Sequence, residues 1–371
     1  MPSDFKVIIV GGGPIGLLAA HALQLAGIDF VVLEQRPRIV EDQGASIIVW
    51  PHTLRVMHQL GILEDLLSMG DELKRHLSFT KEGYAFSVGD RWERTHQNHG
   101  YWPVAFHRAE LIEVLYNTLP PDAKEKVFTS KGLVDIEADE AGVRATCIDG
   151  SFYKGSLVIG ADGVHSKTRS QMRKLALEAD TQRDWDPEEP YLSTYRLLFG
   201  SFPSPCQPNF GYDTHSQDKS ISFFSGEKRG WFFLYEKLPS PTQERVKYTE
   251  DDIQAVAKEF SDFALTQTVK VKDVWSQMCG YGMTTLQEGI LGHWTFGRVV
   301  LIGDSCHKFT THIGLGFNNG VQDVVVLCNA LRKAVHQSSS GIPGYLTLIK
   351  ALQTHEESRK DHKFHLYYLI S

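Results

Sequence analysis

The stretch "KVIIVGGGPIGLLAAHALQLAGIDFVVLEQR", residues 6–36, combines a strand, a glycine-rich turn, a helix and a second strand. The β-branched run at 7–10 is typical of a strand buried in a parallel sheet. Three glycines follow it with the spacing G-x-G-x-x-G, at Gly11, Gly13 and Gly16. In such a turn the first glycine allows the sharp bend, the second admits a pyrophosphate close to the backbone, and the third lets helix and strand pack.

The second strand, 30–33, ends at an acidic residue about twenty positions after the glycines. This residue, Glu34, is placed to accept both hydroxyl protons of an adenosine ribose and to repel a 2′-phosphate, although Arg36 leaves some room for that phosphate. Strand, turn, helix and acid together predict a bound dinucleotide. The pattern does not choose between NAD and FAD.

Two distant segments repeat the arrangement of a buried strand followed by an acid. "GSLVIGADGVHSKTR", residues 155–169, runs from a strand into Asp162. "RVVLIGDSCHKFTTHIGLGFNNGVQDVVVLCNALRKAV", residues 298–335, runs from a strand into Asp304, a glycine-rich loop and a helix predicted from about Asn319. An Asp-Gly turn after one strand is common and is weak evidence by itself. The two segments become informative because they occur together, in the same chain as the opening motif.

The loop after Asp304 holds Cys306, His307 and His312, which raises the alternatives of a metal site and a thiol nucleophile. A third metal ligand stands at no recognisable spacing, and the cysteine has no evident base partner. We therefore predict no metal here. The glycines instead favour a cradle of backbone N–H groups for an anionic ligand.

Composition limits the other classes of function. The 371 residues are 42% hydrophobic with a net charge of −7, which predicts a globular protein without the basic field that nucleic acid requires. The five cysteines form no C-x-x-C pair, and no apolar run reaches the length of about 18 residues that spans a bilayer. A cytoplasmic protein is expected, and association with a membrane surface without a spanning segment is compatible with the sequence.

The motifs, taken in this order, resemble those of the class A FAD-dependent monooxygenases of the para-hydroxybenzoate hydroxylase type. "GASIIVWPHTLRVMHQLGIL", "PVAFHRAELIEVLYNTLP" and "GDSCHKFTTHIGLGFNNG" are similar to the fungal branch acting on prenylated indole alkaloids, meroterpenoids and indole diterpenes. The likeness covers most of residues 5–335. One departure is Thr311, where the family usually has a proline, so the loop is expected to be less rigid.

The resemblance implies an α/β fold, with a Rossmann-like FAD-binding domain and an inserted antiparallel β-sheet domain for the substrate. The FAD-binding domain is then discontinuous, formed by 1–75, 100–180 and 281–371. The resemblance also places the substrate domain at 76–99 and 181–280, and the second range contains aromatic, alternating segments typical of antiparallel strands.

Site residues follow from the same resemblance. It implies that Asp304 binds a ribityl hydroxyl of FAD, and that Gly316, Phe317 and Ile48 contact the cofactor through their main chains. The helix after the loop then directs its N-terminus at the pyrimidine end of the flavin.

Two further assignments stay open. Arg108 is expected to reach the FAD phosphate and ribityl region, the alternative being a surface ion pair with Glu110 or Glu113. Asp162 either orients the flavin or approaches the nicotinamide donor, or it serves only its own turn.

For catalysis the resemblance points to Tyr212 and Arg196, each of which also has a purely structural interpretation. A phenol can donate a proton or hold a polar group of the substrate, and an arginine can polarise an oxygenated flavin.

The implied reaction uses NADPH or NADH as a transient reductant of bound FAD. O2 then forms a flavin C4a-hydroperoxide, which epoxidises or hydroxylates a hydrophobic prenylated, terpenoid or indole metabolite. Three alternatives remain at this point. They are an FAD-dependent dehydrogenase or oxidase, a non-catalytic binding protein that kept the fold, and a flavin halogenase, whose W-x-W-x-I-P segment is absent from this sequence.

Overall fold

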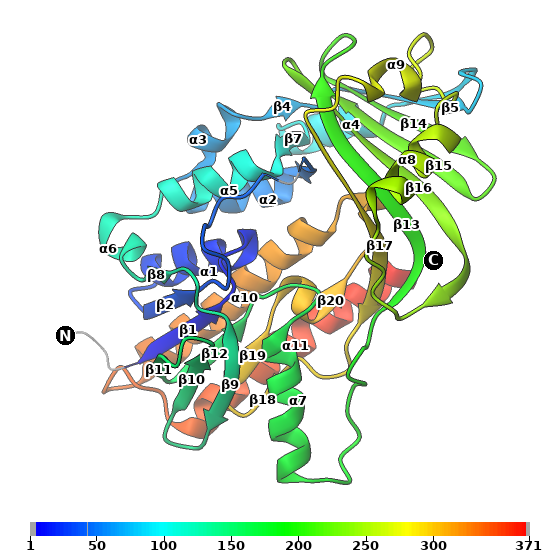
Figure 1. Ribbon diagram of the computed structural model, residues 1–371. Helices are drawn as coiled ribbons and strands as arrows, with labels where there is room; N and C mark the ends of the chain where they lie inside the picture. Colours follow the sequence, from blue (N-terminus) through cyan, green and yellow to red (C-terminus); the bar gives the residue numbers. More distant parts are fainter. Residues whose placement is uncertain (1–4, 43, 369–371) are drawn as a thin grey trace.

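The computed structural model describes residues 5–42 and 44–368. A mostly parallel sheet with its helices forms one half of the molecule, and a large, mostly antiparallel sheet with two short helices forms the other (Figure 1). The sequence prediction of a mixed α/β fold is confirmed.

The parallel sheet contains, within the described ranges, six strands in the order β18-β19-β12-β1-β2-β8. All neighbouring pairs are parallel except β18 with β19. The strands are β1 (Lys6–Val10), β2 (Asp29–Leu33), β8 (Val127–Phe128), β12 (Leu157–Gly160), β18 (Thr295–Phe296) and β19 (Val299–Leu301).

The two faces of this sheet are covered differently, as the alternation along β1 requires. Val7 and Ile9 pack into a core with the helices of one face, whereas Ile8 and Val10 pack toward a small antiparallel sheet on the other. The helices of the first face are α1 (Pro14–Leu25), α2 (Pro51–Gln59), α3 (Leu63–Leu67), α5 (Arg108–Asn117), α6 (Pro121–Lys124), α10 (Gly316–Gln337) and α11 (Tyr345–Tyr368). The second face carries α7 (Lys167–Ala179) and the small sheet of β9 (Leu133–Ala138), β10 (Val143–Cys147) and β11 (Phe152–Gly155).

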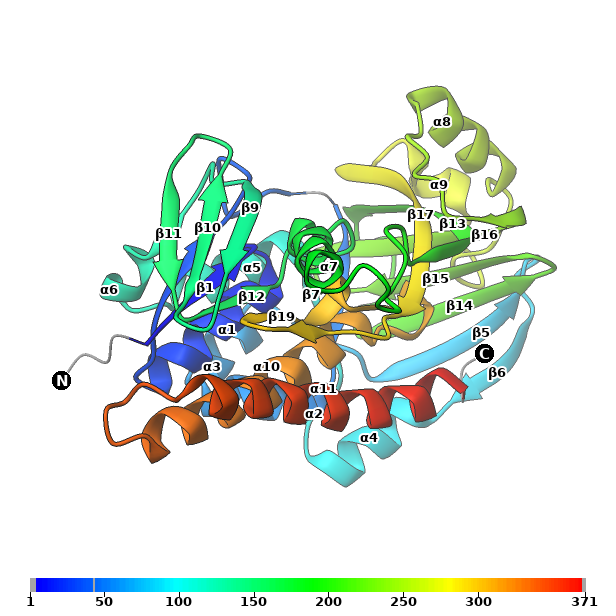
Figure 2. The same cartoon turned by 90° about the horizontal axis from the view of Figure 1, so that it is seen from below.

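The large sheet has, in the part of the chain that the structure describes, eight strands in the order β20-β17-β13-β16-β15-β14-β5-β6. Figure 2 shows it beside the parallel sheet, with α8 and α9 at its outer side. Its elements are β5 (Arg75–Thr80), β6 (Ala85–Gly89), β13 (Leu192–Pro203), β14 (Phe210–Ser216), β15 (Lys219–Ser225), β16 (Arg229–Thr242), β17 (Gly280–Ile290), β20 (His307–Lys308), α8 (Glu250–Glu259) and α9 (Val271–Trp275).

Strand β17 differs from the domain limits expected from the sequence. A boundary between 280 and 281 assigns it to the FAD-binding part, yet it pairs with β13 from Leu192 to Ser201 along the large sheet. The chain returns to the parallel sheet only after this strand.

The remaining elements connect the two halves. They are the bridging sheet of β3 (Ser46–Val49), β7 (Val104–His107) and β4 (Asp71–Glu72), the helix α4 (Arg91–His99), the two-residue strand pairing of β20 with β17, and two 3-10 turns at Gly303–Ser305 and Thr311–Ile313. None of the helices among the described residues combines the length and the hydropathy needed to cross a bilayer.

Candidate active site

A cavity of about 1300 Å³ lies between the ends of the parallel strands and the inner face of the large sheet. Its wall includes Val10, Leu33 and Ala161 at the carboxyl ends of β1, β2 and β12, which is where α/β sheets bind ligands. A pocket for one ligand usually measures about 300–1,000 Å³. The volume therefore suits a cofactor together with a substrate.

Two of the three glycines of the first turn, Gly11 and Gly16, occupy positions where a side chain would collide with the backbone. Gly11 has φ +109°, and an added Cβ would lie 2.5 Å from the carbonyl oxygen of Ala161. At Gly16, which does not line the cavity, a Cβ would lie 1.9 Å from the carbonyl oxygen of Gly11. A Cβ at Gly13 would meet no atom within 4 Å, because this residue faces the cavity. The N-terminus of α1 is thus open to an anionic group such as a pyrophosphate.

Glu34 lies at the end of β2 with 3% of its surface exposed. Its Oε2 accepts a hydrogen bond from the Gly12 N–H at 2.7 Å, and its Oε1 accepts two bonds from the backbone and Nε of Arg36, both at 2.9 Å. A carboxylate has about four acceptor positions. These three bonds leave roughly one acceptor position for a ribose hydroxyl, whereas the sequence suggested that Glu34 accepts from two hydroxyls. The same bonds hold Arg36 against the carboxylate.

Arg108 begins α5 and reaches into the cavity wall. Among the residues that the structure describes, its buried Nη1 has no hydrogen-bond partner, and no ion pair joins it to Glu110 or Glu113. Glu110 pairs with Arg229 instead, at 3.2 Å. Burial lowers the pKa of Arg108, as does the charge of Arg36. A buried guanidinium with an unused donor at a cavity wall is suited to a phosphate group.

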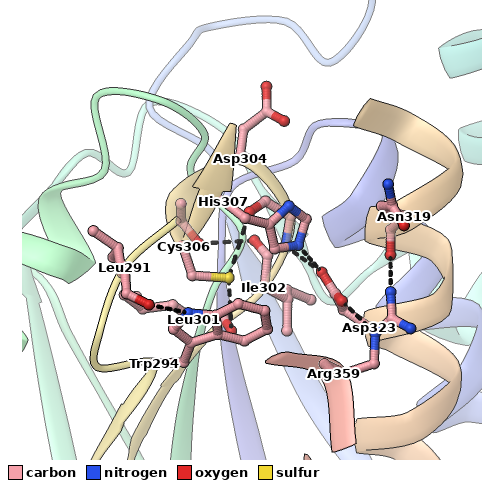
Figure 3. A network of polar contacts seen from close by, with 12 residues as sticks. Leu291, Trp294, Leu301, Ile302, Asp304, Cys306, His307, Asn319, Asp323 and Arg359 are labelled. Atoms are coloured by element: carbon pink, nitrogen blue, oxygen red, sulfur yellow. Dashed lines mark hydrogen bonds and ion pairs between the residues drawn. The ribbon is translucent and has the colours of Figure 1, made fainter. Parts of the chain in front are cut away.

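Asp304 lies in the turn after β19, and its carboxylate points away from the contacts between His307 and Asp323 (Figure 3). Its Oδ2 accepts a bond from Lys308 Nζ at 2.6 Å, and its side chain lines the cavity. Helix α10 begins at Gly316, three residues before the predicted start, and Gly316 and Phe317 also line the cavity. An acid and a helix N-terminus therefore face the same space.

A buried asparagine that the sequence analysis did not single out holds Ile48 in place. The Asn318 Nδ2 donates to the carbonyl oxygens of Ile48 and Gly314, both at 2.8 Å, and its Oδ1 accepts from the Trp50 N–H at 3.0 Å. Ile48 lines the cavity. The residue's place in the "GFNNG" motif was the available signal for this role.

The side chain of Asp162 serves its own turn. It accepts bonds from Ser166 Oγ at 2.5 Å and from the N–H and Oγ1 of Thr168 at 2.9 and 3.0 Å, at the start of α7. Asp162 lines the cavity, but these three donors account for its carboxylate without a cofactor.

The sequence offered no third potential metal ligand for this loop, but the folded chain brings one close to it. The Sγ of Cys306, a ring nitrogen of His307 and a carboxylate oxygen of Asp323 lie within 4.8 Å of one another. The His307 Nε2 and Asp323 Oδ2 are 2.5 Å apart, and Asp323 also accepts a bond from Arg359 (Figure 3). Asp323 belongs to α10, so the spacing of residues within the loop could not reveal it as a third potential ligand.

The inner face of the large sheet forms the other side of the cavity. Its apolar lining residues are Leu197, Phe199, Phe224, Phe233, Met283 and Leu286. On β13 the lining residues Leu197 and Phe199 are two positions apart, as expected when side chains alternate between the two faces of a strand. On β17 every residue from 283 to 287 lines the cavity.

Polar side chains also line this wall, among them Asp213, His76, Ser222 and Gln287. Asp213 bonds His76 at 2.8 Å through Oδ2, and its Oδ1 accepts from Ser222 Oγ at 2.8 Å. Burial by itself raises the pKa of Asp213, but the hydrogen bond to His76 and its charge outweigh burial and leave the pKa lowered. A carboxylate therefore faces the cavity at neutral pH.

Tyr235 and His312 connect the sheet with the glycine-rich loop. Their rings stack with centroids 3.7 Å apart, and the Thr311 Oγ1 donates to the Tyr235 hydroxyl at 3.1 Å. Thr311 stands where the related family usually has a proline, so this bond fixes the loop by another means. Desolvation lowers the pKa of His312 to about 4, and the ring is neutral at pH 7.

The structure does not place Tyr212 and Arg196 at the cavity. Tyr212 packs with the core under α8 and α9, stacked on Phe210 and Phe223, and burial raises its pKa. Arg196 bonds Glu236 at 2.6 Å and does not line the cavity. Both predictions chose the wrong face, since in a strand a change of one position reverses the direction of the side chain.

Comparison with known proteins identifies the class. Residues 4–342 match the family described as FAD binding domain, and the chain belongs to this family. It is 34% identical over 383 residues to the FAD-dependent monooxygenase dpchE of Colletotrichum higginsianum, which covers 98% of this chain and 79% of that protein. The FAD-dependent monooxygenase ausM of Penicillium brasilianum is also 34% identical, over 367 residues, covering 96% of this chain and 76% of the relative.

A solved structure supports the fold. HpxO of Klebsiella pneumoniae, complexed with FAD and uric acid, matches with a TM-score of 0.75 at 24% identity, over 97% of this chain and 85% of that one. The protein is thus an FAD-dependent oxidoreductase of the monooxygenase type, as the motifs predicted.

Proposed function

We propose that this enzyme uses NADPH or NADH and O2 to epoxidise or hydroxylate a hydrophobic prenylated, terpenoid or indole metabolite. The observation that carries the proposal is the single cavity of about 1300 Å³, shared by the glycine-rich loops and the apolar face of the large sheet. A bound flavin and a substrate then lie in one space, which oxygen transfer between them requires.

The residues at the cofactor end fit FAD. Gly13 leaves the N-terminus of α1 open to the pyrophosphate, and the unused donor of Arg108 matches its negative charge. Glu34 suits the adenosine ribose, while Asp304 and the first turn of α10 suit the ribityl chain and the ring. The flavin supplies the oxidation chemistry when it is bound, and the protein supplies orientation and a dry surrounding.

The apolar wall supports the choice of a hydrophobic substrate. Phe199, Phe224 and Phe233 cover the cavity face of three neighbouring strands, and burying a terpenoid or indole surface against them displaces water. Exclusion of water also protects reactive oxygen species from wasteful loss.

Asp213 adds a preference within this substrate class. Two donors already hold its carboxylate in place, and its remaining acceptor positions suit a hydroxyl or indole N–H of the substrate. A substrate carboxylate at the same place would be repelled. The proposed substrate is therefore largely apolar with one hydrogen-bond donor.

Basic residues support the use of a phosphate-bearing reductant. Lys167, Arg245 and Lys247 line the same cavity. Burial lowers the pKa of His165, and the charge of Arg245 lowers it further, which indicates positive charge around this part of the opening. Such a region attracts the phosphates of NADPH or NADH during a transient encounter.

The test is product analysis. The flavin-loaded enzyme is incubated with NADPH or NADH and a panel of prenylated indoles and terpenoids, and products are identified by mass spectrometry and NMR. We expect an epoxide or alcohol from a substrate bearing a hydroxyl or N–H group, and a lower yield from its O- or N-methylated analogue. A product that is oxidised but contains no newly inserted oxygen atom would instead indicate a dehydrogenase or oxidase.

A further inference from the structure

The turn that carries Asp304 is held in place by the side chain of Asp323, which does not line the cavity. Gly303 has φ +64°, a conformation that favours glycine, and its N–H donates to Asp323 Oδ2 at 2.9 Å. Asp304 is the next residue, so the direction of its carboxylate depends on this turn. Asp323 belongs to α10 and is completely buried.

Asp323 is the centre of a buried charge network. Its Oδ2 also accepts from His307 Nε2 at 2.5 Å, and its Oδ1 accepts from Arg359 Nε at 2.8 Å (Figure 3). The Arg359 Nη2 donates in addition to the carbonyl oxygen of Asn319 at 3.2 Å. Removing one partner of such a buried pair leaves an uncompensated charge, which is strongly unfavourable.

Arg359 comes from α11, the last helix of the described chain. It is 6% exposed and does not line the cavity. The same helix is fastened beside the loop by Glu356, whose Oε2 accepts from Thr295 Oγ1 at 2.6 Å, and by the packing of His355 near Trp294. Helix α11 is thus tied to the segment that leads into β19 as well as to α10.

We propose that Asp323 and Arg359 are positioning residues for FAD. Arg359 neutralises and orients Asp323, Asp323 fixes the Gly303 turn, and the turn directs Asp304 toward the cofactor. Helix α11 therefore controls cofactor affinity without touching the cofactor. A metal bound by Cys306, His307 and Asp323 is the competing interpretation, but the carboxylate there already accepts three hydrogen bonds, one of them from a guanidinium.

The experiment measures the FAD dissociation constant of Arg359→Met, Arg359→Lys and Asp323→Asn by titrating flavin-free protein with FAD. The matched control is Glu356→Gln, which changes a half-buried contact of the same helix that does not involve Asp323. We expect Arg359→Met to weaken binding roughly 3- to 30-fold, the usual range for coupling through a network. Arg359→Lys should recover part of the loss, and Glu356→Gln should bind FAD as the wild type does.

A double-mutant cycle with Asp304→Asn separates positioning from general damage. If Arg359 acts through Asp304, Arg359→Met should weaken FAD binding much less in the Asp304→Asn background than alone. Should Arg359→Met not fold, Arg359→Lys is used in the same cycle. Additive effects, wild-type affinity in Arg359→Met, or a stoichiometric metal in the wild type that Asp323→Asn loses would each overturn the proposal.

Discussion

Replacing Arg108 by methionine separates the binding of FAD from the stability of the protein. The side chain is half-buried, its buried Nη1 has no partner among the described residues, and the neighbouring Arg36 carries the same charge. Arg108 also stands at the N-terminus of α5, where a positive charge opposes the helix dipole. Without FAD, the guanidinium therefore contributes little or is unfavourable.

With FAD bound, the same group gains a phosphate partner. A hydrogen bond to a charged group contributes about 1.5–3 kcal/mol, and about 1.4 kcal/mol corresponds to a factor of ten in affinity. Arg108→Met should therefore raise the FAD dissociation constant about 10- to 150-fold. The flavin-free variant should be as stable as the wild type or more stable.

The assay pairs a fluorescence titration of flavin-free protein with FAD and a urea unfolding curve of the same sample. The control is Arg55→Met on α2, which removes an exposed arginine that bonds His99 and does not line the cavity. Unchanged FAD affinity in Arg108→Met would refute the phosphate assignment. So would a loss of stability in the flavin-free variant larger than that of Arg55→Met.

Four further variants test other parts of the site. Glu34→Ala should lose about 1–3 kcal/mol of FAD affinity in an equilibrium titration while its far-UV circular dichroism stays native; equal affinity would remove Glu34 from the ribose site. Asp304→Ala should purify folded but largely without flavin, whereas Cys306→Ala should keep its visible flavin absorbance; the reverse pattern would contradict the cradle. Because the pKa of His312 is lowered from 6.5 to about 4, the unfolded chain binds its proton first as pH falls, and stability is lost between these values. His312→Gln should lose less stability than the wild type over that range in urea unfolding, and identical pH dependence would count against this assignment.

The cofactor end of the site could be predicted because its information is local. A strand, a glycine turn and a helix in direct succession fix where Gly13 and the N-terminus of α1 lie, and Glu34 ends the very next strand. The same holds for Asp304, which follows β19 directly. Motifs of this kind carry their geometry with them.

The substrate side could not be predicted in the same way. Tyr212 and Asp213 are adjacent on β14, and only the packing of α8 and α9 against one face decides which of them reaches the cavity. Alternation gives two sets of residues but does not say which set faces inward.

Contacts across long distances in the sequence were the other limit. His307, Asp323 and Arg359 come from the short strand β20 and two helices, and no sequence spacing relates them. Strand β17 likewise joins the large sheet through pairing with β13, about ninety residues earlier, which its own sequence does not reveal.

The central claim is that this cavity transfers oxygen from O2 to a hydrophobic substrate. The most direct test supplies the flavin-loaded enzyme with reductant, a converted member of the substrate panel and isotopically labelled O2, and measures the label in the product by mass spectrometry. We predict that one labelled oxygen atom enters each product molecule. A product that carries oxygen from water, or a modified substrate without label and with the O2 released as hydrogen peroxide, would contradict it.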